Sequence, residues 1–283
     1  MMRALLLVLG CLGWVSPGVA AEARRIVTVG ASITEATYAL GAGAEVVGVD
    51  RSSRHPDAAT RLPDVGLYSR LSTEGLLSLR PTHVLVTTEA GPAAALEQLR
   101  AAGTRVVVIE GEDSVSGALS RIRGVGAALG LEARAAALVA DLESGLAAVK
   151  PASGKPRVLT LYARGVRTLL VAGDDTGVAD LVARAGGLNA AGGVRGFARL
   201  TPEALVAASP DVVLVSSGGL ASLGGVDGLL AIPGLALTPA GRHRRVVSLD
   251  DALVFGFGPR VVDGLSRLAE ALAAPAMQRG PAE

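Results

Sequence analysis

Short apolar runs rich in valine, isoleucine and leucine alternate with amphipathic stretches along most of the chain. In the first half, these runs predict β-strands at residues 25–29, 45–49, 83–87 and 105–109. Apolar positions at helical spacing predict helices between them, at residues 32–40, 73–79 and 93–101. Ser32 is expected to cap the first helix. Strands that alternate with helices in this way indicate a mostly parallel sheet covered on both faces.

The middle of the chain, residues 114–149, has the pattern of one long helical stretch. Apolar side chains recur at helical spacing, as at Leu119, Ile122 and Val125. Glycines within the stretch weaken the pattern and allow for a kink or a break. It ends in a segment rich in proline and glycine, residues 151–156, which marks a boundary.

The α/β alternation restarts after this boundary. The same reasoning predicts strands at residues 157–162, 169–172, 211–216 and 245–249, with helices at residues 178–185 and 259–272. We therefore expect an α/β protein with two lobes. The N-terminal lobe would span residues 22–112, the connecting long helix 113–152 and the C-terminal lobe 153–283.

An internal repeat supports two related lobes. Residues 71–86 match residues 200–215, and each unit combines a short helix, a proline turn and a buried strand. Ser72 and Thr201 are candidate N-caps, and Glu74 and Glu203 lie in the first turn, where a carboxylate suits the helix dipole. The alternative is that both are generic helix-to-strand units, which α/β proteins repeat freely.

The N-terminus has the pattern of a signal peptide, residues 1–21. Arg3 precedes an apolar run that is too short to span a bilayer, and small residues follow at a cleavage site. A membrane anchor is the alternative. Val8–Cys11 loosely resembles a lipoprotein box, but the downstream site fits better. Removing Cys11 with the signal leaves a mature chain without cysteine, which excludes disulfides, cysteine-ligated zinc and thiol catalysis.

Composition and charge exclude several function classes. The 283-residue chain has a formal net charge of +1 with interspersed charges, so we expect no nucleic-acid partner. The sequence has no Gly-x-Ser-x-Gly elbow and no phosphate-binding loop, so an enzyme on an α/β scaffold is the weaker hypothesis. Three scattered histidines do not supply the ligands of a zinc- or manganese-binding protein.

The two-lobe pattern, the opening segment 25–35 and the Leu-Ser/Thr-x-Glu units resemble the class III periplasmic binding proteins. These proteins serve ABC importers of cobalamin, siderophores and haem. Segment 65–75, Val-Gly-Leu-Tyr-Ser-Arg-Leu-Ser-Thr-Glu-Gly, is similar to the haem-binding branch, as are segments 238–241 and 256–260. The resemblance implies two Rossmann-like lobes joined by a long helix.

The resemblance also implies a ligand for the haem iron. Tyr68 would be the axial ligand, because ferric iron is a hard acceptor and phenolate is a hard donor. Arg70 would support the phenolate if the turn between the two residues is tight. Some members offer a histidine from the second lobe, but the corresponding segment, residues 162–165, has none. Further candidates for haem contacts are Tyr162, Arg164, Arg260, His55 and Arg54. Tyr38, His83 and His243 are expected to be structural or solvated.

Glu74 and Glu203 would meet arginines of the importer's permease dimer, which works with its ATPase subunits. The resemblance therefore implies a monomeric, periplasmic protein that captures haem and performs no chemistry on it. Cobalamin or a ferric siderophore is the alternative cargo on the same fold.

Overall fold

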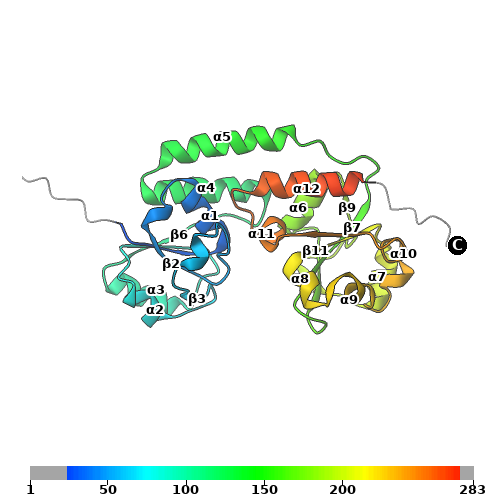
Figure 1. The fold of residues 1–283 in the computed structure, drawn as a ribbon, viewed down its shortest axis with the longest axis horizontal. Helices are drawn as coiled ribbons and strands as arrows, with labels where there is room; N and C mark the ends of the chain where they lie inside the picture. Colours follow the sequence, from blue (N-terminus) through cyan, green and yellow to red (C-terminus); the bar gives the residue numbers. More distant parts are fainter. Residues whose placement is uncertain (1–23, 275–283) are drawn as a thin grey trace, which may run out of the picture.

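The computed structural model describes residues 24–274, and these residues form two α/β lobes side by side (Figure 1). The predicted signal peptide and Cys11 lie outside the described residues. The N-terminal lobe contains a four-stranded parallel sheet in the order β2-β1-β5-β6. Its strands are β1 (Ile26–Val29), β2 (Val46–Val49), β5 (His83–Val86) and β6 (Arg105–Val108). Each lies within a residue or two of its predicted position.

The C-terminal lobe contains a larger, mixed sheet in the order β10-β8-β7-β11-β12, with β9 pairing to β7. Strands β7, β9, β11 and β12 pair in parallel, whereas β8 pairs antiparallel with both β7 and the edge strand β10. Their bounds are β7 (Arg157–Ala163), β8 (Leu169–Ala172), β9 (Leu188–Asn189), β10 (Phe197–Arg199), β11 (Val212–Ser216) and β12 (Val246–Leu249). The predicted mostly parallel α/β fold is confirmed.

Both sheets are covered on two faces, which explains why their strands are mostly apolar. Side chains alternate between faces, so Val213 and Leu214 belong to different cores. In the N-terminal lobe, one face is covered by α1 (Ala31–Ala39) and the other by α2 (Thr73–Ser78) and α3 (Ala93–Ala101). In the C-terminal lobe, one face is covered by α6 (Gly177–Arg184), α11 (Asp251–Phe255) and α12 (Val261–Ala273). The other is covered by α7 (Pro202–Ala208), α8 (Ser217–Ser222), α9 (Gly225–Leu230) and α10 (Pro239–Arg242).

The connecting segment is helical but consists of two helices rather than one. Helix α4 (Val115–Leu129) ends at Gly130, which has a φ of 67°, and α5 (Glu132–Ala148) then packs back along α4. A positive φ is cheap only for glycine, so Gly130 is the residue that permits the reversal. The start of α4 belongs to the core of the C-terminal lobe and the rest to that of the N-terminal lobe, so this helix joins both.

The predicted caps of the repeated units are confirmed. The Ser72 hydroxyl accepts a hydrogen bond from the Gly75 N–H at 3.1 Å, and Thr201 accepts one from the Ala204 N–H at 3.2 Å. The prediction for Ser32 was wrong, because α1 begins at Ala31 and Ser32 is buried inside its first turn. Gly30 occupies the N-cap position of α1, and no side chain forms a capping hydrogen bond there.

Candidate ligand-binding cleft

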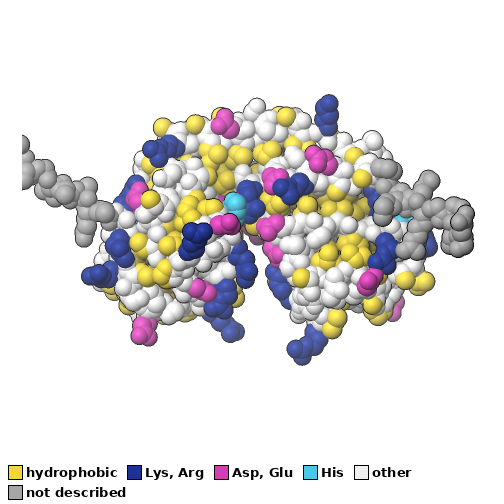
Figure 2. Space-filling view, in the orientation of Figure 1, with side chains coloured by type: hydrophobic (Ala, Val, Ile, Leu, Met, Phe, Trp, Pro, Cys, Tyr) yellow, Lys and Arg dark blue, Asp and Glu magenta, His cyan; other side chains and the backbone are white. Residues whose placement is uncertain are grey.

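A hollow separates the two lobes on the side opposite α5 (Figure 2), and basic side chains lie along both of its walls. The strand β3 (Gly66–Leu67) borders it from the N-terminal lobe, whereas α8 and α11 border it from the C-terminal lobe (Figure 1). The loops after β7, β11 and β12 also lead to this side. Ligands of open α/β sheets bind outside the carboxyl ends of the strands, so this hollow is the candidate site.

Tyr68 lies at the tip of a short hairpin on the wall of the N-terminal lobe. Strands β3 and β4 (Arg70–Leu71) pair antiparallel, with Leu67 opposite Arg70, which leaves Tyr68 and Ser69 as the turn. The side chain of Tyr68 is 37% exposed, so its phenol is accessible to a ligand. The Tyr68 carbonyl accepts a hydrogen bond from the Gly91 N–H at 2.8 Å, which ties the turn to the segment after β5.

The base of this hairpin is held by Asp64. Its carboxylate accepts hydrogen bonds from the Gly66 N–H at 2.7 Å and from the Arg51 guanidinium at 3.0 Å. Burial alone would raise the pKa of the Asp64 carboxyl, but these two hydrogen bonds outweigh it and lower that pKa below its usual value. Gly66 has a φ of 105°, a conformation that favours glycine, and a Cβ at this position would lie 2.7 Å from the Arg70 carbonyl oxygen. The sequence Asp-x-Gly therefore shapes the turn that presents Tyr68.

The other candidates of the N-terminal lobe are exposed. Arg70 lies on β4 as the cross-strand partner of Leu67, and among the described residues no hydrogen bond joins its guanidinium to Tyr68. Arg54 and His55 lie in the exposed loop after β2. Their roles in binding haem stay predictions.

On the opposite lobe, Tyr162 belongs to a cluster of three aromatic rings. Its ring centroid is 6.1 Å from that of Phe197 and 5.7 Å from that of Phe255, and both contacts are edge-to-face. The Phe197 and Phe255 centroids are 6.2 Å apart. Phe197 is 46% exposed, so part of its ring is open to solvent. We call these three residues the aromatic wall.

Arg164 covers the Tyr162 ring, with its guanidinium carbon 4.7 Å from the ring centroid. Asp251 holds this arginine through an ion pair of 3.1 Å. The same carboxylate accepts hydrogen bonds from the Ser216 hydroxyl at 3.0 Å and the Gly218 N–H at 2.9 Å. Asp251 thus links the carboxyl ends of three neighbouring strands and positions Arg164 against Tyr162.

Arg260, one of the predicted haem contacts, forms a contact between the lobes. Its guanidinium donates two hydrogen bonds to the buried Glu35 carboxylate of α1, at 3.0 and 2.6 Å. These hydrogen bonds raise the pKa of Arg260 above its ordinary value. Asp250, the neighbour of Asp251, lies 3.6 Å from the same guanidinium. Asp251, which holds Arg164, therefore directly follows a residue at the junction between the lobes.

Glu74 and Glu203 are both exposed, one on α2 and one on α7, so each lobe presents one carboxylate. Sequence reasoning missed Phe197, Phe255 and Asp251. Composition offered one signal, the rarity of phenylalanine, of which the chain has only three. The structure shows that two of the three are partly exposed. The pairing of Asp251 with Arg164 had no sequence signal, since the two residues are 87 positions apart.

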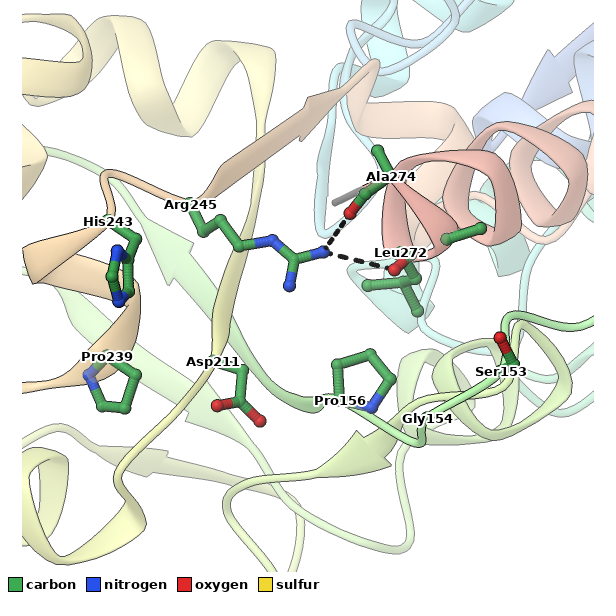
Figure 3. Close-up of a pocket in the computed structure, with 10 residues that line it drawn as sticks. Ser153, Gly154, Pro156, Asp211, Pro239, His243, Arg245, Leu272 and Ala274 are labelled. Atoms are coloured by element: carbon green, nitrogen blue, oxygen red, sulfur yellow. Dashed lines mark hydrogen bonds between the residues drawn. The ribbon is translucent and has the colours of Figure 1, made fainter. Parts of the chain in front are cut away.

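A second hollow, of about 420 Å³, lies between the start of β12 and the end of α12 (Figure 3). Arg245 crosses it and donates hydrogen bonds to the carbonyls of Leu272 and Ala274, at 3.2 and 2.8 Å. His243 and Asp211 also line it. None of the predicted haem contacts lies in this hollow. Among residues 24–274 no cluster of three or more histidine, cysteine or acidic side chains could hold a metal ion.

Comparison with known proteins identifies relatives that share this architecture. The family model "Periplasmic binding protein" matches residues 26–253. The periplasmic heme-binding protein RhuT of Roseiflexus sp. RS-1 is 44% identical with a TM-score of 0.85, over 89% of this chain and 98% of RhuT. The periplasmic heme-binding protein BhuT, solved in complex with two hemes, is 41% identical with a TM-score of 0.81, over 88% of this chain and 99% of BhuT.

An uncharacterized ABC transporter substrate-binding lipoprotein, YvrC of Bacillus subtilis strain 168, is 29% identical over 259 residues, which are 89% of this chain and 80% of YvrC. YvrC is thus named as a substrate-binding protein of an ABC transporter, whereas RhuT and BhuT are named as periplasmic heme-binding proteins. Because the family match covers most of the chain and the two-lobed fold agrees with it, this protein belongs to the periplasmic binding protein family.

Proposed function

We propose that this protein captures ferric haem in the cleft between its lobes and delivers it to an ABC importer. The observation that carries the proposal is the pairing of two walls. An exposed tyrosine at the tip of a hairpin borders the hollow from one lobe, and an aromatic wall lies on the other. The similarity to RhuT and BhuT, both named as heme-binding proteins, supports the same cargo.

Tyr68 would bind the iron through its phenolate oxygen. Ferric iron favours the deprotonated phenol, and tyrosine is a known axial ligand of haem. Arg70 follows two residues later and would stabilise the phenolate when the cargo is bound. Tyr162 and Arg164 repeat the Tyr-x-Arg spacing on the opposite lobe, so Tyr162 is the candidate for a second ligand.

Glu74 and Glu203 would contact the two halves of the permease dimer. Exposed carboxylates on both lobes suit a partner that repeats its own surface twice, and such charges mainly set orientation and on-rate. We propose that the protein acts outside the cytoplasm as a monomer, after export by the N-terminal signal, and that it does not transform its cargo.

A haemin titration of the purified mature protein tests the proposal. We expect a Soret band that shifts on binding and saturates, and cobalamin in excess should not displace the haemin. The endpoint counts the haems: one indicates a single site in the cleft, and two indicate that Tyr68 and Tyr162 each bind a haem of their own. A colourless protein in excess haemin would contradict the proposal, and displacement by cobalamin or a ferric siderophore would assign a different cargo.

A further inference from the structure

The aromatic wall has properties that a ligand for iron does not need. The chain has seven aromatic residues, and three of them meet at this one place. Phe197 packs edge-to-face against Tyr162 and at a tilt against Phe255, yet 46% of its surface is exposed. A ring that is fixed by its neighbours and open to solvent loses little freedom when a flat ligand packs against it. Phe197 is therefore prepared for a contact that the protein by itself does not make.

The charge of Arg164 beside this wall is balanced. Its ion pair with Asp251 and its position over Tyr162 occupy the guanidinium, so the wall offers a planar cation and an apolar ring without an uncompensated positive charge. At this wall the guanidinium is already paired, so the wall itself suits a flat conjugated macrocycle better than an anionic ferric siderophore.

We propose that Phe197 is a specificity-determining residue that recognises the flat porphyrin ring itself, whether or not the ring holds iron. The inference rests on the proposed function and deepens it. Tyr68 binds the iron from one lobe. Phe197, which packs against Tyr162 and Phe255, contacts the flat face of the macrocycle from the other lobe. Iron-free protoporphyrin IX therefore binds in the same cleft, more weakly than haemin.

The test compares two ligands and four proteins. Haemin binding is followed by absorbance and protoporphyrin IX binding by fluorescence, with the wild type, Phe197→Ala, Phe197→Tyr and Tyr68→Ala. We expect Phe197→Ala to lower the affinity for both ligands by about tenfold. Phe197→Tyr keeps the ring and should bind like the wild type. Tyr68→Ala should lower the affinity for haemin to about that for protoporphyrin IX, and its affinity for protoporphyrin IX should match that of the wild type.

Leu237→Ala is the matched control, because Leu237 is an apolar residue of the same lobe that is 67% exposed and lies outside the aromatic wall. Thermal unfolding of each variant checks that the fold is retained. The inference is overturned if Phe197→Ala binds protoporphyrin IX as tightly as the wild type, or if the wild type binds haemin but no protoporphyrin IX. A wild type that binds neither ligand contradicts the proposed function instead, so the two failures are distinguishable.

Discussion

Arg260 and Glu35 form a bidentate ion pair that ties the two lobes together. The two residues are 225 positions apart, yet both nitrogens of the pair lie within 3.0 Å of a carboxylate oxygen. Glu35 is 6% exposed, so its charge depends on this one partner for compensation. The pair links the first helix of the N-terminal lobe to the residue that precedes α12 of the C-terminal lobe.

Replacing Glu35 with glutamine should destabilise the protein measurably. The change leaves the Arg260 guanidinium partly buried without its main partner, and breaking such a pair costs about 2–4 kcal/mol after allowance for its partial exposure. Urea unfolding measures the free energy. The control is Arg267→Gln, which breaks the exposed pair with Asp263 and should cost less than about 0.5 kcal/mol. Equal effects of the two variants would contradict a special role for the pair between the lobes.

The two tyrosines should differ in their effect on haem binding. We expect Tyr68→Phe to remove the ferric phenolate spectrum and most of the affinity for haemin, because the ring stays but the ligand oxygen is lost. Arg70→Ala should weaken binding less, about tenfold. Absorbance and electron paramagnetic resonance spectra of the haemin complexes measure both. An unchanged spectrum in Tyr68→Phe, with a lost spectrum in Tyr162→Phe, would move the principal ligand to the other lobe.

Glu74 and Glu203 should matter for transport and not for binding. The double variant Glu74→Lys with Glu203→Lys reverses both exposed charges and should slow delivery to the importer at least about tenfold at low salt. Haemin affinity in solution should not change, because neither side chain lies in the cleft walls described above. Uptake by importer-containing proteoliposomes gives the rate. Reversal of another exposed carboxylate, Glu143→Lys, is the control, and equal losses would argue against docking by these two residues.

His83 should make the protein less stable in mild acid. Burial and the nearby Arg105 and Arg24 lower the pKa of its imidazole below 6.5, so the folded state favours the neutral ring. Below about pH 6.5 the unfolded chain binds a proton that the folded chain does not, and stability falls as pH drops from there towards the lowered pKa. His83→Gln should remove this part of the slope, measured by urea unfolding between pH 7 and 5. An unchanged slope in His83→Gln would contradict this role for His83.

Much of the fold follows from local pattern alone. The apolar runs predicted nearly all the long strands, because a strand buried on both faces must be apolar at every position. Ser72 and Thr201 could be identified as caps, since a cap depends on residues three positions apart. The break at Gly130 was only partly foreseeable. Glycine permits a reversal there, but the packing of α5 on α4 decides that the chain takes it.

The candidate site likewise combines features that are local in sequence with contacts between distant residues. Asp64, Gly66 and Tyr68 lie within five positions, so the turn that they form depends on residues that are close in sequence. The aromatic wall joins residues 162, 197 and 255, and the contact between the lobes joins residues 35 and 260. No periodicity relates such distant positions. Only the tertiary structure brings them together, because burying both sheet faces sets which strand ends and loops become neighbours.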